Sequence, residues 1–369
     1  MGFRRKAIAG AVAIGLLGTV PAAAGTDPFR TAVHGLVDAG FPGAVAYQRT
    51  GTGHRAFAEG VADLATGRAA LPGDRFRVAS NTKAFVAAIV FQLAESGRLS
   101  LQDSVRRWLP GVVGGPGYDA SKITVERLLN HTSGVHDPRD PEFFAPYLDE
   151  HRRGYVYTPD EVIRRSLVDP PATGPEYSNT GYLLLGKIIE RVTHHTAESE
   201  IRHRLIGPLG LTRTTFPRYD PFIHGRHLHG YDMKNEDMTV FSPSYDWTAG
   251  AVISTVDDLA KFQRALLGGK LVGADSLARM KQVVLEEGPI GYGLGLERLT
   301  APCPGGRQVV AWGGTGAGPG YYSMAFTTDD GSRQAVLGLS KYDLRADVTK
   351  VGKVAPAPPA PAMLAALCG

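Results

Sequence analysis

The sequence lacks any long run of lysine and arginine, and its formal net charge at pH 7 is only +4 over 369 residues. The basic residues are scattered rather than gathered in one segment. Proteins that bind a phosphate polymer concentrate positive charge on one surface or along one stretch. The composition therefore argues against a nucleic-acid partner.

Long apolar segments are also missing. The longest candidate, residues 7–20, is too short and too rich in alanine and glycine for a membrane span. It follows the basic residues 4–6 and precedes the alanines at 22–24, which is the order of parts in a secretory signal peptide. We therefore expect residues 1–24 to be a signal peptide, cleaved during general secretion rather than twin-arginine export, and the protein to be extracellular.

Cysteine is scarce: Cys303 lies in a Pro/Gly-rich turn, and Cys368 is next to the last residue. An even number of cysteines in an exported protein predicts a disulfide, and two free thiols are the alternative. A bridge between Cys303 and Cys368 would tie the Pro/Ala-rich tail, residues 346–369, to the body of the protein.

A metal site is not indicated either. His224, His227 and His229 form a histidine-rich segment, but no carboxylate or cysteine is spaced to complete a tetrahedral site around them. We expect no metal and no cofactor, and we interpret this segment as a loop near the mouth of a cleft.

What the sequence does contain is the composition of an ordinary globular protein, 43% hydrophobic and 21% charged, without an internal repeat. Strand patterns occur near both ends, with helical patterns between them. That order predicts an α+β fold. Residues 25–80 and 250–345 would form an antiparallel sheet flanked by helices, and residues 81–249 would form an inserted, mostly helical region. A cleft would lie where the two regions meet. Late strands are expected at residues 292–297, 308–312, 321–327 and 334–340.

Ser80 and Lys83 are the residues that most suggest catalysis. The Ser-x-x-Lys step stands at the start of a predicted buried helix, so that the hydroxyl and the amine lie on one helical face, one turn apart. A lysine desolvated by apolar neighbours has a lowered pKa and can accept the proton of the hydroxyl. The alternative is an ordinary helix cap followed by a solvated lysine.

Two later motifs favour the catalytic interpretation. Tyr177-Ser178-Asn179 is the only Tyr-x-Asn in the chain, and a phenol beside a lysine can shuttle protons between nucleophile, water and leaving group. The glycine-rich stretch at residues 313–318 predicts an edge strand that a substrate backbone can approach closely and pair with.

Five segments stand in a specific order along the chain: Ser80-Asn81-Thr82-Lys83, Leu128-Leu129-Asn130-His131-Thr132-Ser133-Gly134, Tyr177-Ser178-Asn179, Trp247-Thr248-Ala249-Gly250 and Gly313-Gly314-Thr315-Gly316. Together they resemble the serine beta-lactamase and D,D-peptidase superfamily. The chain is most similar to the class C beta-lactamases and to the secreted D-alanyl-D-alanine carboxypeptidases of actinomycetes. The resemblance extends from about residue 32 to residue 340.

The resemblance implies roles for individual residues. Ser80 would be the acylated nucleophile, Lys83 its partner and Tyr177 the general base and acid. The N–H groups of Ser80 and Ala317 would hold the oxyanion. His131 is expected to support a loop rather than act in catalysis. Substrate contacts would come from Asn179, Trp247, Gly314, Thr315, Gly316 and Ala317.

Two positions depart from the family pattern. Gly314 replaces the basic residue of the third motif, and Glu297 stands where the carboxypeptidases have an arginine that grips the substrate's terminal carboxylate. Arg298 follows, but neighbouring residues on a strand face opposite sides, so that it cannot simply replace that arginine. The loss of positive charge favours an esterase, amidase or transacylase over a carboxypeptidase or beta-lactamase.

The sequence thus predicts a secreted serine hydrolase that acts through an acyl-enzyme on a peptide, an amide or an ester. The alternatives are a D-alanyl-D-alanine carboxypeptidase or penicillin-binding protein, and a transacylase or catalytically idle binding homologue. The expected partner is a small molecule or a peptide, such as a cell-wall peptide or a beta-lactam.

Overall fold

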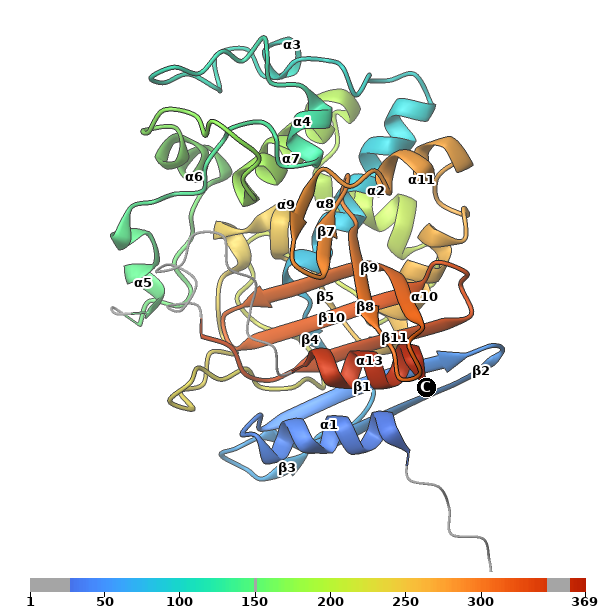
Figure 1. Ribbon diagram of the computed structural model, residues 1–369. Helices are drawn as coiled ribbons and strands as arrows, with labels where there is room; N and C mark the ends of the chain where they lie inside the picture. The colour runs from blue at the N-terminus through green and yellow to red at the C-terminus, as the bar shows by residue number, and fades with distance from the viewer. Residues whose placement is uncertain (1–26, 149–150, 344–358) are drawn as a thin grey trace, which may run out of the picture.

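The computed structural model describes residues 27–148, 151–343 and 359–369 (Figure 1). The expected signal peptide and residues 346–358 of the expected tail lie outside these residues. Helices and antiparallel strands form the α+β arrangement that the sequence predicts. Within the described ranges, no helix is both long and apolar enough to cross a bilayer.

A nine-stranded antiparallel sheet is built from both ends of the chain. Its strands, in the order in which they pair, are β3 (Arg68–Ala69), β2 (Gly53–Asp63), β1 (Gly43–Thr50), β11 (Arg333–Leu339), β10 (Tyr321–Thr328), β9 (Gln308–Gly318), β8 (Glu297–Pro302), β7 (Ile290–Tyr292) and β6 (Leu285–Glu287). The N-terminal hairpin joins the C-terminal strands because β1 pairs with β11. A separate pair, β4 (Phe76–Arg77) and β5 (Ile253–Ser254), connects the segments next to the helical region.

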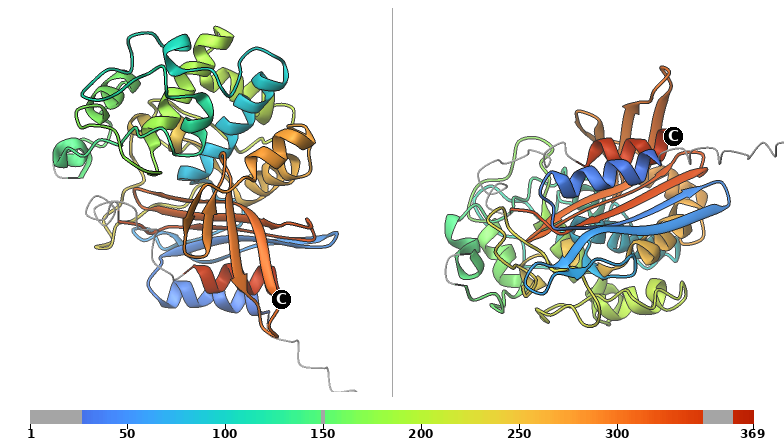
Figure 2. Two further views of the ribbon diagram at one scale, coloured as in Figure 1. Left: turned by 45° about the horizontal axis from the view of Figure 1, so that its top comes forward. Right: turned by 90° about the horizontal axis from the view of Figure 1, so that it is seen from below.

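Helices lie on both faces of the large sheet, and further helices form a region beyond one of these faces (Figures 1 and 2). The α-helices of the described residues are α1 (Pro28–Asp38), α2 (Thr82–Glu95), α3 (Val105–Trp108), α4 (Val125–Leu129), α5 (Ala145–Leu148), α6 (Pro159–Ser166), α7 (Asn179–Thr193), α8 (Ala197–Ile201), α9 (Trp247–Gly250), α10 (Val256–Leu267), α11 (Ala274–Met280) and α13 (Ala360–Cys368). The two terminal helices, α1 and α13, lie on one face, and α2 and α10 lie on the other, beneath the helical region.

The alternation of side chains along β1 explains why the core has two layers. Ala44 packs in the cluster formed with α1 and α13, whereas its neighbour Val45 packs in the cluster formed with α2 and α10. In the second cluster, Phe85 of α2 stacks on Phe262 of α10 with 3.5 Å between ring centroids. Helix α2, which is buried along nearly its whole length, is therefore held firmly between the sheet and the helical region.

The strand expected at residues 292–297 is wrong. Residues 293–296 form a turn between β7 and β8, closed by a hydrogen bond from the Gly293 N–H to the Leu296 carbonyl (2.8 Å). Gly295 has a φ of +84°, and an added Cβ there would lie 2.3 Å from the Cβ of Ala87 on α2. The alternating glycines that suggest a strand instead allow this turn to pack closely against the helix.

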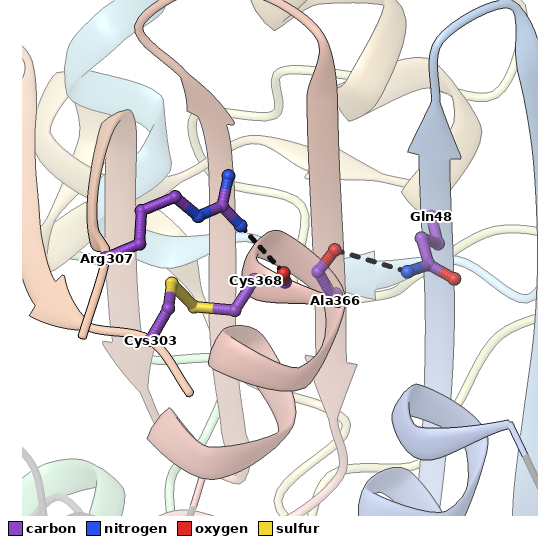
Figure 3. Close-up of a disulfide and its surroundings, with 5 residues drawn as sticks. All are labelled: Gln48, Cys303, Arg307, Ala366 and Cys368. Atoms are coloured by element: carbon purple, nitrogen blue, oxygen red, sulfur yellow. Dashed lines mark hydrogen bonds between the residues drawn. A yellow bond between two sulfur atoms is a disulfide. The ribbon is translucent and has the colours of Figure 1, made fainter. Parts of the chain in front are cut away.

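A disulfide between Cys303 and Cys368 holds the C-terminal helix against the sheet (Figure 3). The guanidinium of Arg307 donates to the Cys368 carbonyl (2.8 Å), and the Gln48 amide on β1 donates to the Ala366 carbonyl (3.2 Å). The two cysteines are 65 residues apart, and in the chain-entropy account closing such a loop stabilises a protein by about 4 kcal/mol. The helix α13 is thus an integral part of the layer that it forms with α1 on one face of the sheet.

Candidate active site

Ser80 stands at the junction between β4 and α2, in the short 3-10 turn η1 (Ala79–Asn81). The residue before it, Ala79, has a φ of +46°, a left-handed conformation that costs a residue with a Cβ about 1–2 kcal/mol. Such strain persists only where the surrounding structure imposes it, and it clusters at functional sites. The turn places Ser80 just ahead of the first turn of α2, which carries Lys83.

Lys83 is the centre of the site and is only 1% exposed. Its Nζ donates hydrogen bonds to Ser80 Oγ (2.9 Å), to Asn179 Oδ1 (2.7 Å) and to the Ala249 carbonyl (3.0 Å). Burial lowers the pKa of Lys83 from 10.5 to about 8, against the opposing effect of nearby carboxylates. The neutral amine, which can act as a base, is therefore accessible near physiological pH.

Tyr177 contacts the same hydroxyl as Lys83. Its Oη donates to Ser80 Oγ at 2.9 Å, and the Nζ of Lys83 lies 4.8 Å from the centre of its ring. Burial raises the pKa of Tyr177 well above 10, so that the phenol stays protonated at physiological pH. In the resting site Tyr177 is thus a proton donor, whereas Lys83 is the group whose pKa has moved toward neutrality.

His131 holds Tyr177 and its neighbour rather than Ser80. The centre of its ring lies 4.3 Å from that of Tyr177, and its Nδ1 accepts the backbone N–H of Ser178 at 3.1 Å. Burial, together with the charge of Lys83, lowers the pKa of His131 well below 6.5, and the ring is therefore neutral. This is a supporting position.

Asp137 belongs to the site although no sequence motif marks it. Its carboxylate accepts hydrogen bonds from Asn179 Nδ2 (2.9 Å) and from the N–H of Thr180 (2.8 Å), at the start of α7. Asn179 is thereby oriented with its amide oxygen toward Lys83 and its amide nitrogen toward Asp137. An acid 42 residues earlier, in a proline-rich loop, cannot be recognised as its partner before the fold is known.

Asp246 is a second buried carboxylate without a sequence signal. It is 6% exposed, and among the described residues its Oδ1 has no hydrogen-bond partner. Burial raises the pKa of Asp246 to about 6, while the charge of Lys83 opposes that increase. Of the nearby carboxylates, Asp246 does most to counter the lowering of the Lys83 pKa by burial. It therefore helps to set the pH at which the lysine becomes a base.

Strand β9 presents an open edge beyond the start of β8. Glu297, the first residue of β8, lies opposite Gly313, so that in the described chain residues 314–318 have no partner strand on that side. The N–H of Thr315 points to this side, because it donates to the Glu297 carboxylate (2.9 Å). Since N–H groups alternate along a strand, the N–H of Ala317 faces the same open side.

Gly316 brings this edge close to the nucleophile. An added Cβ at Gly316 would lie 2.1 Å from the Val78 carbonyl oxygen and 3.1 Å from the backbone nitrogen of Ser80. The N–H groups of Ser80 and Ala317 consequently belong to neighbouring stretches of backbone, as an oxyanion site requires. A side chain at position 316 would force the two stretches apart.

The two departures from the family pattern both lie at this edge. Gly314 contributes no side chain, and Glu297, which is 7% exposed, binds Thr315 through its carboxylate. Arg298 is directed instead to Glu286 on β6, with which it pairs at 2.8 Å. Arg298 therefore does not supply the missing positive charge, for the reason that the alternation along a strand predicts.

Trp247, for which the sequence predicts a substrate contact, has its side chain in the core. Its side chain is fully buried, its Nε1 donates to Glu198 Oε1 on α8 (2.6 Å), and the Arg218 guanidinium lies 4.3 Å from the ring centre. A buried indole needs an acceptor for its N–H, and Glu198 provides it. Trp247 instead begins α9, where it has a φ of +27°. The Ala249 carbonyl of the same helical turn accepts a hydrogen bond from Lys83.

The histidine-rich segment is separate from this constellation. His224, His227 and His229 hydrogen bond to three different partners near them in the chain. In the ranges that the structure describes, no three potential metal ligands come together.

Matches to known proteins agree with this geometry. The sequence profile of the Beta-lactamase family matches residues 29–348. The chain belongs to the Beta-lactamase family. The match spans the strands at both ends, the helix of Ser80 and Lys83, and the segment of Tyr177, so that the resemblance carried by five short segments is confirmed.

Sequence relatives within the Beta-lactamase family include two penicillin-binding proteins. Penicillin-binding protein 4* of Bacillus subtilis is 29% identical over 309 residues, which are 79% of this chain and 65% of the relative. Penicillin-binding protein 4 of Amycolatopsis lactamdurans is 30% identical over 248 residues, which are 62% of this chain and 61% of the relative. The chain thus spans less than two thirds of the length of these curated relatives.

Solved structures match over more of their length. A D-stereospecific amidohydrolase from Streptomyces sp. superposes with a TM-score of 0.77 and 34% identity, covering 85% of this chain and 94% of that one. A D-amino acid amidase from Ochrobactrum anthropi SV3 superposes with a TM-score of 0.74 and 26% identity, covering 85% and 92%. A class C beta lactamase from Rhodobacter sphaeroides, at 20% identity, shares the fold with a TM-score of 0.69. Together with the family match, these likenesses show that the chain has the fold of the Beta-lactamase family over most of its length.

Proposed function

We propose that this member of the Beta-lactamase family hydrolyses amides and esters of D-amino acids through an acyl-enzyme on Ser80. The observation that carries the proposal is that Ser80 Oγ receives hydrogen bonds from both Lys83 and Tyr177, each at 2.9 Å. A hydroxyl between an amine of lowered pKa and a protonated phenol is arranged for attack followed by protonation of the leaving group. The two amidase-like neighbours support a D-amino acid as the acyl group.

The proton transfers follow from these contacts. Neutral Lys83 takes the proton of Ser80 Oγ as that oxygen attacks the substrate carbonyl. The N–H groups of Ser80 and Ala317 hold the oxyanion. Tyr177 gives its proton to the departing amine or alcohol and regains one from Lys83. Water then attacks the acyl-enzyme by the same route and releases the acid.

Intact-mass spectrometry with a small substrate panel tests this proposal. The panel contains D-phenylalanine amide, L-phenylalanine amide and the p-nitrophenyl ester of an acylated D-amino acid. We expect an acyl adduct with the ester and faster hydrolysis of the D-amide than of the L-amide. The absence of any adduct or turnover would favour an idle binding homologue, and acyl transfer to an added amine in preference to water would identify a transacylase.

The names of the sequence relatives favour a second candidate, a penicillin-binding protein. The resemblance of the motifs gives this candidate the activity of a D-alanyl-D-alanine carboxypeptidase. Such an enzyme is labelled by a fluorescent penicillin and releases D-alanine from a peptide ending in D-Ala-D-Ala. Ester hydrolysis without penicillin labelling would favour the amidase. Labelling as fast as acylation by the ester, together with D-alanine release, would favour the carboxypeptidase.

The pH dependence of catalysis should follow the titration of Lys83. Because its pKa is lowered to about 8, the amine is mostly protonated at neutral pH and becomes the neutral base as the pH rises. We expect kcat/KM to rise about tenfold per pH unit well below pH 8 and to level off above it. Measuring a neutral ester between about pH 6 and about pH 10 checks this, and a flat profile would contradict Lys83 as the base.

We also propose that the protein is secreted. The basic, apolar and alanine-rich parts of residues 1–24 support this, and a disulfide such as Cys303–Cys368 is typical of exported proteins. Expression of the full chain in a secreting bacterial host should give an extracellular product whose first residue, by N-terminal sequencing, lies near Gly25. An uncleaved chain retained in the cytoplasm would contradict secretion.

A further inference from the structure

Glu297 occupies a position on the open edge of β9 where a substrate anion would find two hydrogen-bond donors. It is 7% exposed, and its carboxylate accepts hydrogen bonds from the N–H of Thr315 (2.9 Å) and from the hydroxyl of the same residue (3.0 Å). An N–H and a hydroxyl side by side form a good binding position for a carboxylate, because each donates to one of its oxygens. In this chain the protein's own carboxylate fills that position.

Glu297 is also close enough to act on the catalytic groups. Burial raises the pKa of Tyr177, and among the neighbouring charges that of Glu297 adds most to the increase. The geometry agrees, because Tyr292 pairs with Glu297 across β7 and β8 and the ring of Tyr292 lies 5.8 Å from that of Tyr177. In the proposed reaction the proton of Tyr177 goes to the departing group. The departing group is consequently the part of the substrate that comes next to Glu297.

We propose that Glu297 is a specificity-determining residue that selects the charge of the departing group. It favours a departing amine that carries a second, protonated amino group, and it rejects a departing group that carries a carboxylate. A buried carboxylate attracts a cation and repels an anion more strongly than an exposed one, because water and salt screen it less. The inference rests on the proposed function and names the class of leaving group that the same site prefers.

A purely structural role for Glu297 makes a different prediction. Its two bonds to Thr315 also fasten the start of β8 to β9. Glu297→Gln separates the roles, because glutamine offers an oxygen to the N–H and an amide donor to Oγ while the negative charge is lost. Glu286→Gln is the matched control, since it makes the same change of charge at a side chain that is 56% exposed and paired with Arg298.

The substrates for this test are three amides that share one D-amino acyl group and differ only in the departing amine: ethylenediamine, ethylamine or glycine. In the wild type, kcat/KM is expected to decrease in that order. Glu297→Gln is expected to reduce the ratio between the first and the last by about tenfold or more, as for the loss of a hydrogen bond to a charged group. Glu286→Gln should leave the ratio unchanged.

The outcomes separate this inference from the function on which it rests. Suppose that wild type and Glu297→Gln both hydrolyse the ethylamide, and that the ratio of kcat/KM between the ethylenediamine amide and the glycine amide is the same in both. Glu297 is then structural, and the inference fails while the proposed function stands. If the wild type neither hydrolyses the ethylamide nor forms an acyl adduct, the proposed function fails as well. A measurement without a variant is competition with the ethylamide: propylammonium should inhibit the wild type at lower concentration than propionate, and the reverse order would contradict the inference.

Discussion

Replacing Ser80 with alanine should abolish acyl-enzyme formation and reduce kcat/KM for every ester or amide substrate by about 10⁴-fold or more. The reason is that Ser80 Oγ is the atom to which both Lys83 and Tyr177 donate hydrogen bonds. Without Ser80 Oγ, no atom at this position can attack the substrate carbonyl, although Lys83 and Tyr177 remain in place. Intact-mass spectrometry after exposure to a reactive ester should show an adduct on the wild type and none on Ser80→Ala.

Ser96→Ala provides the control for this experiment. Ser96 follows the last turn of α2, and its hydroxyl donates to backbone carbonyls of that helix. This variant should retain full activity. Ser80→Ala should remain folded, because Lys83 keeps its bonds to Asn179 and to the Ala249 carbonyl. An adduct formed in equal yield on Ser80→Ala would place the nucleophile elsewhere.

Removing a single oxygen in Tyr177→Phe should have the second-largest effect. We expect kcat/KM for amides to fall by about 10²- to 10⁴-fold, the usual contribution of a positioned acid or base. The loss should be smaller for p-nitrophenyl esters, because p-nitrophenolate departs without being protonated. This difference is expected of a phenol that enters the reaction protonated, since burial raises the pKa of Tyr177 well above 10.

Tyr292→Phe is the matched control for Tyr177→Phe. The ring of Tyr292 lies 5.8 Å from that of Tyr177, but its hydroxyl pairs with that of Tyr182 at 3.2 Å rather than with Ser80. The control should retain most of its activity on both kinds of substrate. If Tyr177→Phe loses amides and activated esters to the same extent, Tyr177 acts as the base and not as the donor to the leaving group.

Two residues that support the catalytic groups cannot be recognised from sequence motifs. Asp137 orients Asn179, and Asp246 places a buried negative charge near Lys83. Asp137 lies in an irregular loop and Asp246 in the turn before α9, and their roles arise only because distant helices meet them. Trp247 shows the converse, since it stands in a conspicuous motif and yet its side chain is buried against Glu198.

The edge of β9 shows a similar division. The loss of positive charge at Gly314 and Glu297 can be read from the motif, because it concerns which residue stands at each position. The binding of Glu297 to Thr315 cannot be read in the same way. The two residues are 18 positions apart, and they meet only because β8 begins opposite Gly313 while β9 continues past it.

The local chemistry and the fold class follow from the order of the residues. Ser80 and Lys83 share a helical face because of the period of a helix, and strand patterns at both ends require an antiparallel sheet completed from the two terminal segments. Two contacts become visible only in the folded chain: Lys83 binds Asn179, 96 residues later, and the Glu297 carboxylate binds Thr315 at the open edge. Periodicity reflects interactions between near neighbours, whereas these contacts depend on how distant segments pack.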